Sequence, residues 1–213
     1  MSMLIELTGP QERLVRAAER LLAEKGLGAV STREIAREAG QKNHSALNYH
    51  FGSFDGLISA ILDFRMAPLN ARRLRLLREL RKTHGELEVK ELVRVMVEPL
   101  AFELLRPPED SRYLRLLSQL VGHGEWQSMF SEKPERSSAL LETGEALLAQ
   151  LETEMDQEIA FERLRLLGLH VLMTVTEWDA MARRGELQLD AEALAWRVDN
   201  LVKYLAAALT AEE

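Results

Sequence analysis

Helix starts and stops follow one another closely in the first 60 residues, and this spacing constrains the fold more than any other feature. The segment Thr8–Gln11 combines a capping threonine, a proline in the first turn and a glutamine at the capping-box position, and Ser31–Glu34 is a second capping box. Gly26 and Gly40 stand where these two helices should end. A third short helix is expected over 43–51. Three short helices, the last two joined by a tight turn, predict a helix-turn-helix.

The rest of the chain also favours helix. Leu, Ala, Glu and Arg dominate, and 46% apolar with 29% charged residues is ordinary for a globular protein. Longer helices are predicted near 54–82, 86–106, 109–122, 134–154, 159–184 and 190–209. We therefore expect an all-α protein of about nine helices, with a helix-turn-helix domain at 1–60 and a larger helical domain at 61–213.

Motifs for catalysis or metal binding are missing from the sequence. The chain has no cysteine, which excludes disulfides and thiol chemistry and fits a reducing compartment. The five histidines are scattered, and His44 and His50 are too far apart for the usual i, i+4 ligation. No signal peptide is evident, and the most apolar run, 164–175, is too short to span a membrane. We expect a cytoplasmic protein that is not an enzyme and needs neither metal nor cofactor.

Charge is distributed unevenly along the chain. The formal net charge is −7, yet residues 1–56 hold seven basic and seven acidic residues, and residues 65–82 hold seven basic residues against one acidic. Binding to a polyanion depends on this local balance more than on the total. The net charge therefore does not exclude a nucleic-acid partner.

The expected third helix has a polar outer face. A step of about 100° per residue from Leu47 places Phe51 on the same, inward side. The side chains predicted to face outward are those of Ser45, Ala46, Asn48 and Tyr49. Such small or hydrogen-bonding groups suit the major groove, where amides read adenine and hydroxyls reach phosphates. A merely solvated short helix is the competing interpretation, although such a helix more often carries Glu and Lys.

Many positions agree at once with a known pattern. They are Ala17, Ala18, Leu21, Leu22, Gly26, Thr32, Ile35, Ala36, Ala39, Gly40, Leu47, Tyr49, His50, Phe51 and Leu57. With this spacing, the segment Pro10–Ile61 resembles the N-terminal domain of the TetR-like family of bacterial transcriptional regulators. Beyond it the resemblance is architectural. It implies a homodimer that binds a palindromic operator in double-stranded DNA, and a small-molecule effector pocket in the C-terminal helices.

The resemblance places DNA contacts in the second and third helices. The residues expected to contact DNA are Thr32, Arg33, Gln41, Lys42, Asn43, His44, Ser45, Ala46, Asn48, Tyr49 and His50. Two departures from the family pattern matter. Phe51 follows Gly40 by eleven positions where the family has ten, and Phe54 stands where the family often has a lysine. The extra residue either lengthens the turn or shifts which side chains meet the bases.

Two apolar faces near the C-terminus suit a dimer. They are formed by Leu164, Leu167, Gly168, Val171, Leu172 and Val175, and by Leu194, Val198, Leu201, Val202 and Leu205. Such helices can close a monomer core or form a four-helix interface with their twofold copies. With the family resemblance, we expect the interface.

Candidates for the effector pocket combine apolar and polar side chains. They are Phe102, His123, Trp126, Phe130, Met173 and Glu177. The sequence thus predicts a ligand-responsive repressor that a small apolar or amphipathic effector releases from DNA. The alternative is a helical protein-interaction module that has lost DNA binding.

Overall fold

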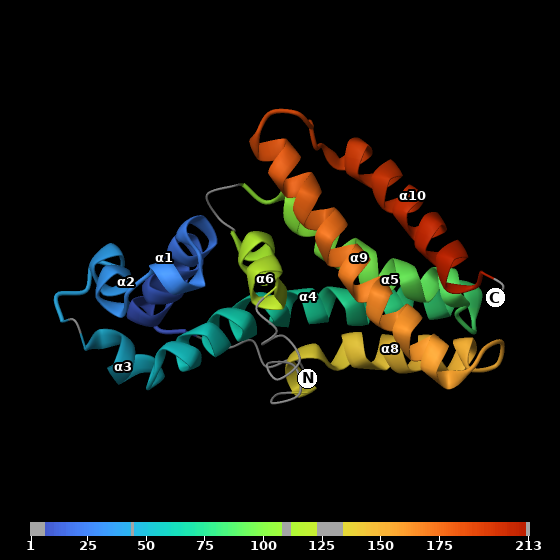
Figure 1. Ribbon diagram of the computed structural model, residues 1–213, viewed down its shortest axis with the longest axis horizontal. Helices are drawn as coiled ribbons and strands as arrows, with labels where there is room; N and C mark the ends of the chain where they lie inside the picture. Colours follow the sequence, from blue (N-terminus) through green and yellow to red (C-terminus); the bar gives the residue numbers. More distant parts are fainter. Residues whose placement is uncertain (1–6, 44, 108–111, 123–133, 212–213) are drawn as a thin grey trace. The chain divides into compact units, whose positions relative to one another are not determined.

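The computed structural model describes residues 7–43, 45–107, 112–122 and 134–211, and the regular elements within these ranges are all helices (Figure 1). The prediction of an all-α protein is confirmed. The α-helices are α1 (Gly9–Lys25), α2 (Thr32–Glu38), α3 (Ala46–Phe51), α4 (Phe54–His84), α5 (Val89–Ala101), α6 (Tyr113–Gly122), α8 (Ser138–Leu151), α9 (Gln157–Arg183) and α10 (Ala191–Leu209). Short 3-10 turns occupy Leu27–Ala29, Phe102–Leu105 and Pro134–Ser137. Over the same ranges, every helix falls short of the length or the hydropathy that a membrane span requires.

The helix starts predicted from capping residues are found in the structure. The Gln11 side chain accepts a hydrogen bond from the backbone N–H of Thr8 at 3.0 Å, which closes the first turn of α1. The Ser31 hydroxyl accepts one from the backbone N–H of Glu34 at 3.2 Å, at the start of α2. Both caps are local in sequence, so the pattern of residue types is sufficient to place them.

The chain divides into two compact units, and the first consists of residues 1–68 and 108–136. Within this unit α1 packs on α2 and on α6 (Figure 1). Its buried apolar side chains include Leu14, Leu22, Ile35, Leu47, Leu57, Leu116 and Leu120. The three short helices therefore share one core with α6, although 61 residues lie between the end of α3 and the start of α6. The functional division at residue 60 stays a prediction.

A buried ion pair joins three segments of this first unit. Glu19 of α1 accepts hydrogen bonds from Arg65 of α4 at 2.6 Å and 3.0 Å, and both side chains are almost fully buried. The same carboxylate also accepts the backbone N–H of Arg112 at 2.6 Å. Two charged groups removed from water need this degree of hydrogen bonding to offset their desolvation.

The second unit comprises residues 69–107 and 137–213. In it α5 packs against α8, α9 and α10, and α9 lies beside α10 (Figure 1). The core of this unit includes the side chains of Leu92, Val93, Val97, Leu147 and Val202.

The two apolar faces expected at a dimer interface point into this core instead. Leu167, Val171, Leu172, Val175, Leu194, Val198, Leu201, Val202 and Leu205 are buried within the single chain, and Leu164 and Gly168 are half-buried. Side chains already covered by α5 and α8 are not available to a second copy. The physical reason is that the most apolar face of an amphipathic helix packs first against its own domain.

The opposite faces of α9 and α10 retain large apolar side chains in contact with water. Phe161 and Met173 of α9 are each 55% exposed, and Trp196 and Tyr204 of α10 are 56% and 62% exposed. Phe161 and Met173 lie about 120° apart around α9, and Trp196 and Tyr204 about 80° apart around α10, so each pair lies on the outward side of its helix. Two adjacent helices with such side chains provide an apolar surface that the described chain leaves uncovered.

Candidate nucleic-acid interface

The end of α2 is fixed by its backbone. Gly40 has a positive φ of 67°, and its N–H donates to the carbonyl of Arg37, while the N–H of Gln41 donates to the carbonyl of Ala36. This pair of hydrogen bonds is a Schellman motif, which needs a residue without a Cβ at the left-handed position. The chain therefore leaves α2 along a defined path.

The turn after Gly40 is longer than expected, and α3 begins at Ala46 instead of Asn43. The Asn43 side chain accepts a hydrogen bond from the backbone N–H of Ser45 at 2.9 Å, and the Asn43 carbonyl accepts the N–H of Ala46 at 3.1 Å. An asparagine bonded in this way stabilises a turn in competition with helix. The extra residue of this segment thus lies before the start of α3, and the assignment of base contacts stays a prediction.

The side chains predicted to contact DNA differ in exposure. Tyr49 is 84% exposed, and the other exposed members of the set are Arg33, Lys42, Asn43, Ser45 and Asn48. Thr32, Gln41 and His50 are half-buried. Ala46 is only 7% exposed, so the expectation that it faces outward is wrong: the later start of α3 puts it beside Leu47 in the core. His44 lies outside the described residues.

Two anchors hold α3 against the rest of the first unit. Leu47 is fully buried, as predicted, and Phe51 is half-buried. The Tyr49 ring meets the His50 ring edge-on, with centroids 5.0 Å apart. This contact restricts the orientation of the one large aromatic side chain that α3 presents to solvent.

Gly56, which the sequence argument did not single out, sets how closely α4 follows α3. A Cβ at this position would lie 2.0 Å from the carbonyl oxygen of Phe51. Ser53 caps α4 by accepting the N–H of Gly56 at 3.0 Å. Glycine has a low helix propensity, so a glycine in the first turn of a long helix is unfavourable. This unfavourable residue type was the signal in the sequence that could have pointed to a close approach at Gly56.

The electrostatics of this segment favour an anionic partner. Arg33 and Lys42 are exposed cations, and the segment from Gln41 to Phe51 contains no carboxylate. The nearest acids in sequence are Glu38, which pairs with Arg20, and Asp55. Glu34, at the start of α2, is held by Lys25 at 2.6 Å, and this hydrogen bond lowers the pKa of the Glu34 carboxyl. A surface with cations, amides and hydroxyls attracts phosphate groups and can hydrogen-bond base edges.

The structure describes three of the six expected effector residues. Met173 and Glu177 lie on the exposed side of α9, and Phe102 is half-buried beneath the Arg72 guanidinium, 4.7 Å from its ring centre. His123, Trp126 and Phe130 lie outside the described residues. Across the described ranges, no three His, Asp or Glu side chains cluster as metal ligands do.

The comparisons with known proteins agree with this geometry. Residues 14–61 match the family model of bacterial regulatory proteins, tetR family, which confirms the resemblance inferred over this segment. The match covers α1, α2, α3 and the first turns of α4, the elements that form the candidate interface. Comparison with curated proteins found no match.

Solved structures with the same fold extend over nearly the whole chain. A transcriptional regulator from Rhodococcus sp. Rha1 has a TM-score of 0.56 at 22% identity, covering 97% of this chain and 100% of its own. The fatty acid degradation regulator FadR from Bacillus halodurans has a TM-score of 0.55 at 16% identity, covering 96% of each chain. A candidate TetR-family transcriptional regulator from Mesorhizobium loti MAFF303099 has a TM-score of 0.50 at 14% identity, covering 95% of this chain and 98% of its own.

Proposed function

We propose that this chain, which carries a tetR-family DNA-binding segment at residues 14–61, is a sequence-specific transcriptional regulator. It acts as a ligand-responsive repressor that binds a palindromic operator as a dimer. The observation that carries this proposal is the set of exposed side chains near α3, which the Schellman turn of α2 and the buried Leu47 hold in place; they are Lys42, Asn43, Ser45, Asn48 and Tyr49. A rigid backbone presenting amides, a cation and a phenol suits the reading of a DNA groove.

The roles within this segment follow from its chemistry. Gln41 and Asn48 carry amides that can pair with adenine, and Asn43 keeps its amide N–H groups available while its oxygen closes the turn. The Tyr49 hydroxyl, which projects from a side chain that is 84% exposed, is suited to a phosphate oxygen. Thr32 and Arg33 at the start of α2 would add further contacts to the backbone of the duplex.

Selection of bound duplexes from a random pool tests the proposal most directly. We expect an enriched palindrome whose half-sites lie about one helical turn apart or more, because a symmetric dimer reads two equivalent half-sites. An intact dimer that enriches no sequence and fails to shift any duplex at low salt would support the protein-interaction module instead.

The contribution of Tyr49 can be measured with a change of one atom. Tyr49→Phe keeps the ring and its contact with His50 but removes the hydroxyl, so affinity should fall by a similar factor for operator and random duplex. Loss of one such hydrogen bond corresponds to about threefold to tenfold. Thr83→Val, which removes a hydroxyl from an exposed residue near the C-terminal end of α4, should leave both affinities unchanged.

The dimer surface that we propose is the outer side of α9 and α10. Phe161, Met173, Trp196 and Tyr204 are exposed there, and burying each large apolar side chain against a second copy would contribute about 1.5–3 kcal/mol. This surface replaces the inward-facing residues that the sequence pattern suggested.

Release by a small apolar or amphipathic effector completes the proposed function. Binding of such a ligand to the helices after residue 61 would shift the population of dimers away from the DNA-binding arrangement. A metabolite screen that measures dissociation from the selected operator tests this step. A regulator that none of the compounds releases would contradict ligand-responsive repression and leave DNA binding unaffected.

A further inference from the structure

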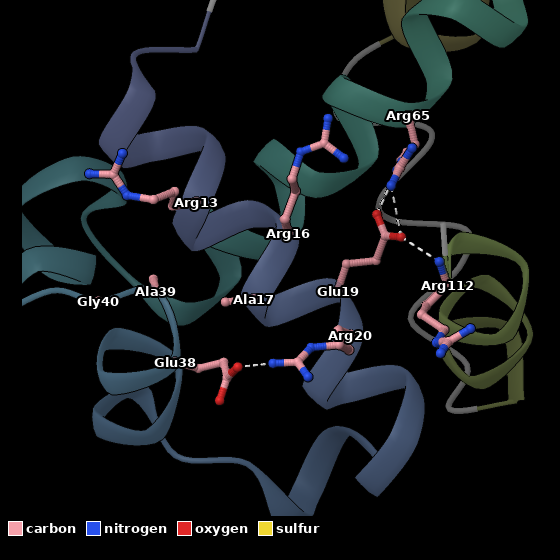
Figure 2. A pocket seen from close by; sticks show the side chains of 10 residues that line it. All are labelled: Arg13, Arg16, Ala17, Glu19, Arg20, Glu38, Ala39, Gly40, Arg65 and Arg112. Carbon is pink, nitrogen blue, oxygen red and sulfur yellow. Dashed lines mark hydrogen bonds and ion pairs between the residues drawn. The ribbon is translucent and has the colours of Figure 1, made fainter. Parts of the chain in front are cut away.

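A groove of about 460 Å³ lies in the first unit, over the surface of α1 (Figure 2). Its floor is made by small residues, Ala17 of α1 with Ala39 and Gly40 at the end of α2. Its rim carries five arginines, at positions 13, 16, 20, 65 and 112. Figure 2 shows Arg13, Arg16 and Arg20 projecting from α1 around Ala17. We call this site the arginine groove.

Two of the five arginines are neutralised inside the groove. Arg65 is paired with Glu19, and both side chains are almost fully buried. Arg20 is paired with Glu38, and these two side chains are 45% and 41% exposed. Of the residues that the structure describes, Glu19 and Glu38 are the only carboxylates that line the groove.

Among the other three arginines, Arg13 and Arg16 are exposed and give the groove positive charge. Arg16 donates from both Nε and Nη2 to one oxygen of Glu12, which lies outside the lining. Arg112 Nε is 3.6 Å from Glu24, a carboxylate that also lies outside the lining. Within the described part of the chain, no carboxylate pairs with Arg13. Among the described residues, the lining holds five arginines and two glutamates.

This arrangement has the properties of an anion site. A guanidinium has five N–H donors in a planar fork that matches the oxygens of a phosphate, and exposed ion pairs such as Arg16–Glu12 yield readily to a stronger anion. Small side chains at the floor let a ligand approach the backbone closely. The volume falls within the range of small-molecule pockets, roughly 300–1,000 Å³.

We propose that the arginine groove binds a free small molecule bearing a phosphate group. The same chemistry could be supplied by a phosphate of the DNA backbone, but none of the residues expected to contact DNA lines the groove. Thr32 and Arg33 lie at the other end of α2, and a helix of seven residues is about 10 Å long. The groove thus gives the regulator a second ligand-binding site. This site takes an anionic ligand and lies in the DNA-binding unit itself.

Titration of the full-length protein with inorganic pyrophosphate at constant ionic strength tests the proposal. We expect saturable binding, with the backbone amide signals of Ala17, Ala39 and Gly40 shifting during the titration. Arg13→Gln with Arg16→Gln should weaken this binding about tenfold or more, since both forks are lost. Arg75→Gln with Arg78→Gln makes the same change of charge at exposed positions of α4 outside the groove, and binding should stay within about twofold.

Three outcomes would overturn the proposal. The first is no saturable binding to the wild-type protein, and the second is equal weakening by the two double variants, which would indicate general attraction to positive charge. The third is a large loss of duplex affinity in the Arg13 and Arg16 variant without any pyrophosphate site, which would assign these guanidinium groups to the DNA backbone. The amide shifts use the wild-type protein, so the test does not depend on how the variants fold.

Discussion

At the scale of single residues, Gly56 sets the closest approach between two helices. Gly56→Ala would place a methyl group 2.0 Å from the carbonyl oxygen of Phe51, so α3 or the start of α4 must move. Strain of this kind costs about 1–3 kcal/mol, and we expect the free energy of unfolding to fall by that amount in urea titrations. Displacement of α3 should also weaken binding to duplex DNA.

Gly144→Ala is the matched control for this prediction. Gly144 lies inside α8, and a Cβ there would be 3.8 Å from Leu164, an ordinary contact. Removing a helical glycine should raise the free energy of unfolding by about 0.5–1 kcal/mol. If both substitutions lowered stability equally, the close approach at Gly56 would not be the cause.

Glu19 carries a second prediction at this scale. Glu19→Gln leaves the Arg65 guanidinium buried without its counter-charge, and we expect a loss of about 3–5 kcal/mol in the free energy of unfolding. Glu38→Gln breaks the exposed pair with Arg20 and should cost less than about 1 kcal/mol. Similar losses for the two variants would show that the buried pair contributes no more than a surface pair.

At the scale of helices, the outer sides of α9 and α10 predict the oligomeric state. A charge placed on this surface in both copies should oppose association, so Phe161→Arg with Tyr204→Arg should give a monomer in size-exclusion chromatography with light scattering. Leu141→Arg changes an exposed leucine of α8, 43% exposed, and should leave a dimer. A dimer in both variants would place the interface elsewhere.

The positions of the helices could be predicted from the sequence because their signals are local. Thr8 and Ser31 cap the helices they were expected to cap, and Gly40 ends α2 in the conformation that its residue type suggests. The start of α3 could not be placed from the sequence, because Asn43 suits either a helix terminus or a turn. Which of the two forms depends on how the side chains of Ala46 and Leu47 reach the core.

Which face of a helix meets a partner was harder to predict than the helix itself. The most apolar stripes of α9 and α10 are the obvious candidates for an interface, yet they are buried within the chain. The weaker stripe, with single aromatic residues such as Phe161 and Tyr204 among polar ones, stays exposed. The partners of Glu19 are 46 and 93 residues away, and no local pattern indicates them.

At the scale of the whole molecule, a net charge of −7 opposes binding to DNA, and local cations favour it. We therefore expect affinity for duplex DNA to fall steeply with salt, with a slope of log K against log salt near −0.9 for each phosphate contacted. Arg33→Gln should reduce this slope by about one if the exposed guanidinium contacts a phosphate. An unchanged slope for Arg33→Gln would exclude that contact. The control is Lys90→Gln, which removes a cation from an exposed position of α5 and should leave the slope unaltered.

The hydrogen bond between Glu19 and the backbone of Arg112 has a consequence for synthesis on the ribosome. Protein chains emerge at about 5–20 residues per second, so α1 waits several seconds before the segment that completes its surroundings has been made. Until then the side of α1 that α6 covers is open to chaperones and to other nascent chains. A mutation that weakens the Glu19 cluster would therefore lower the yield of folded protein in the cell even where the finished molecule remained active.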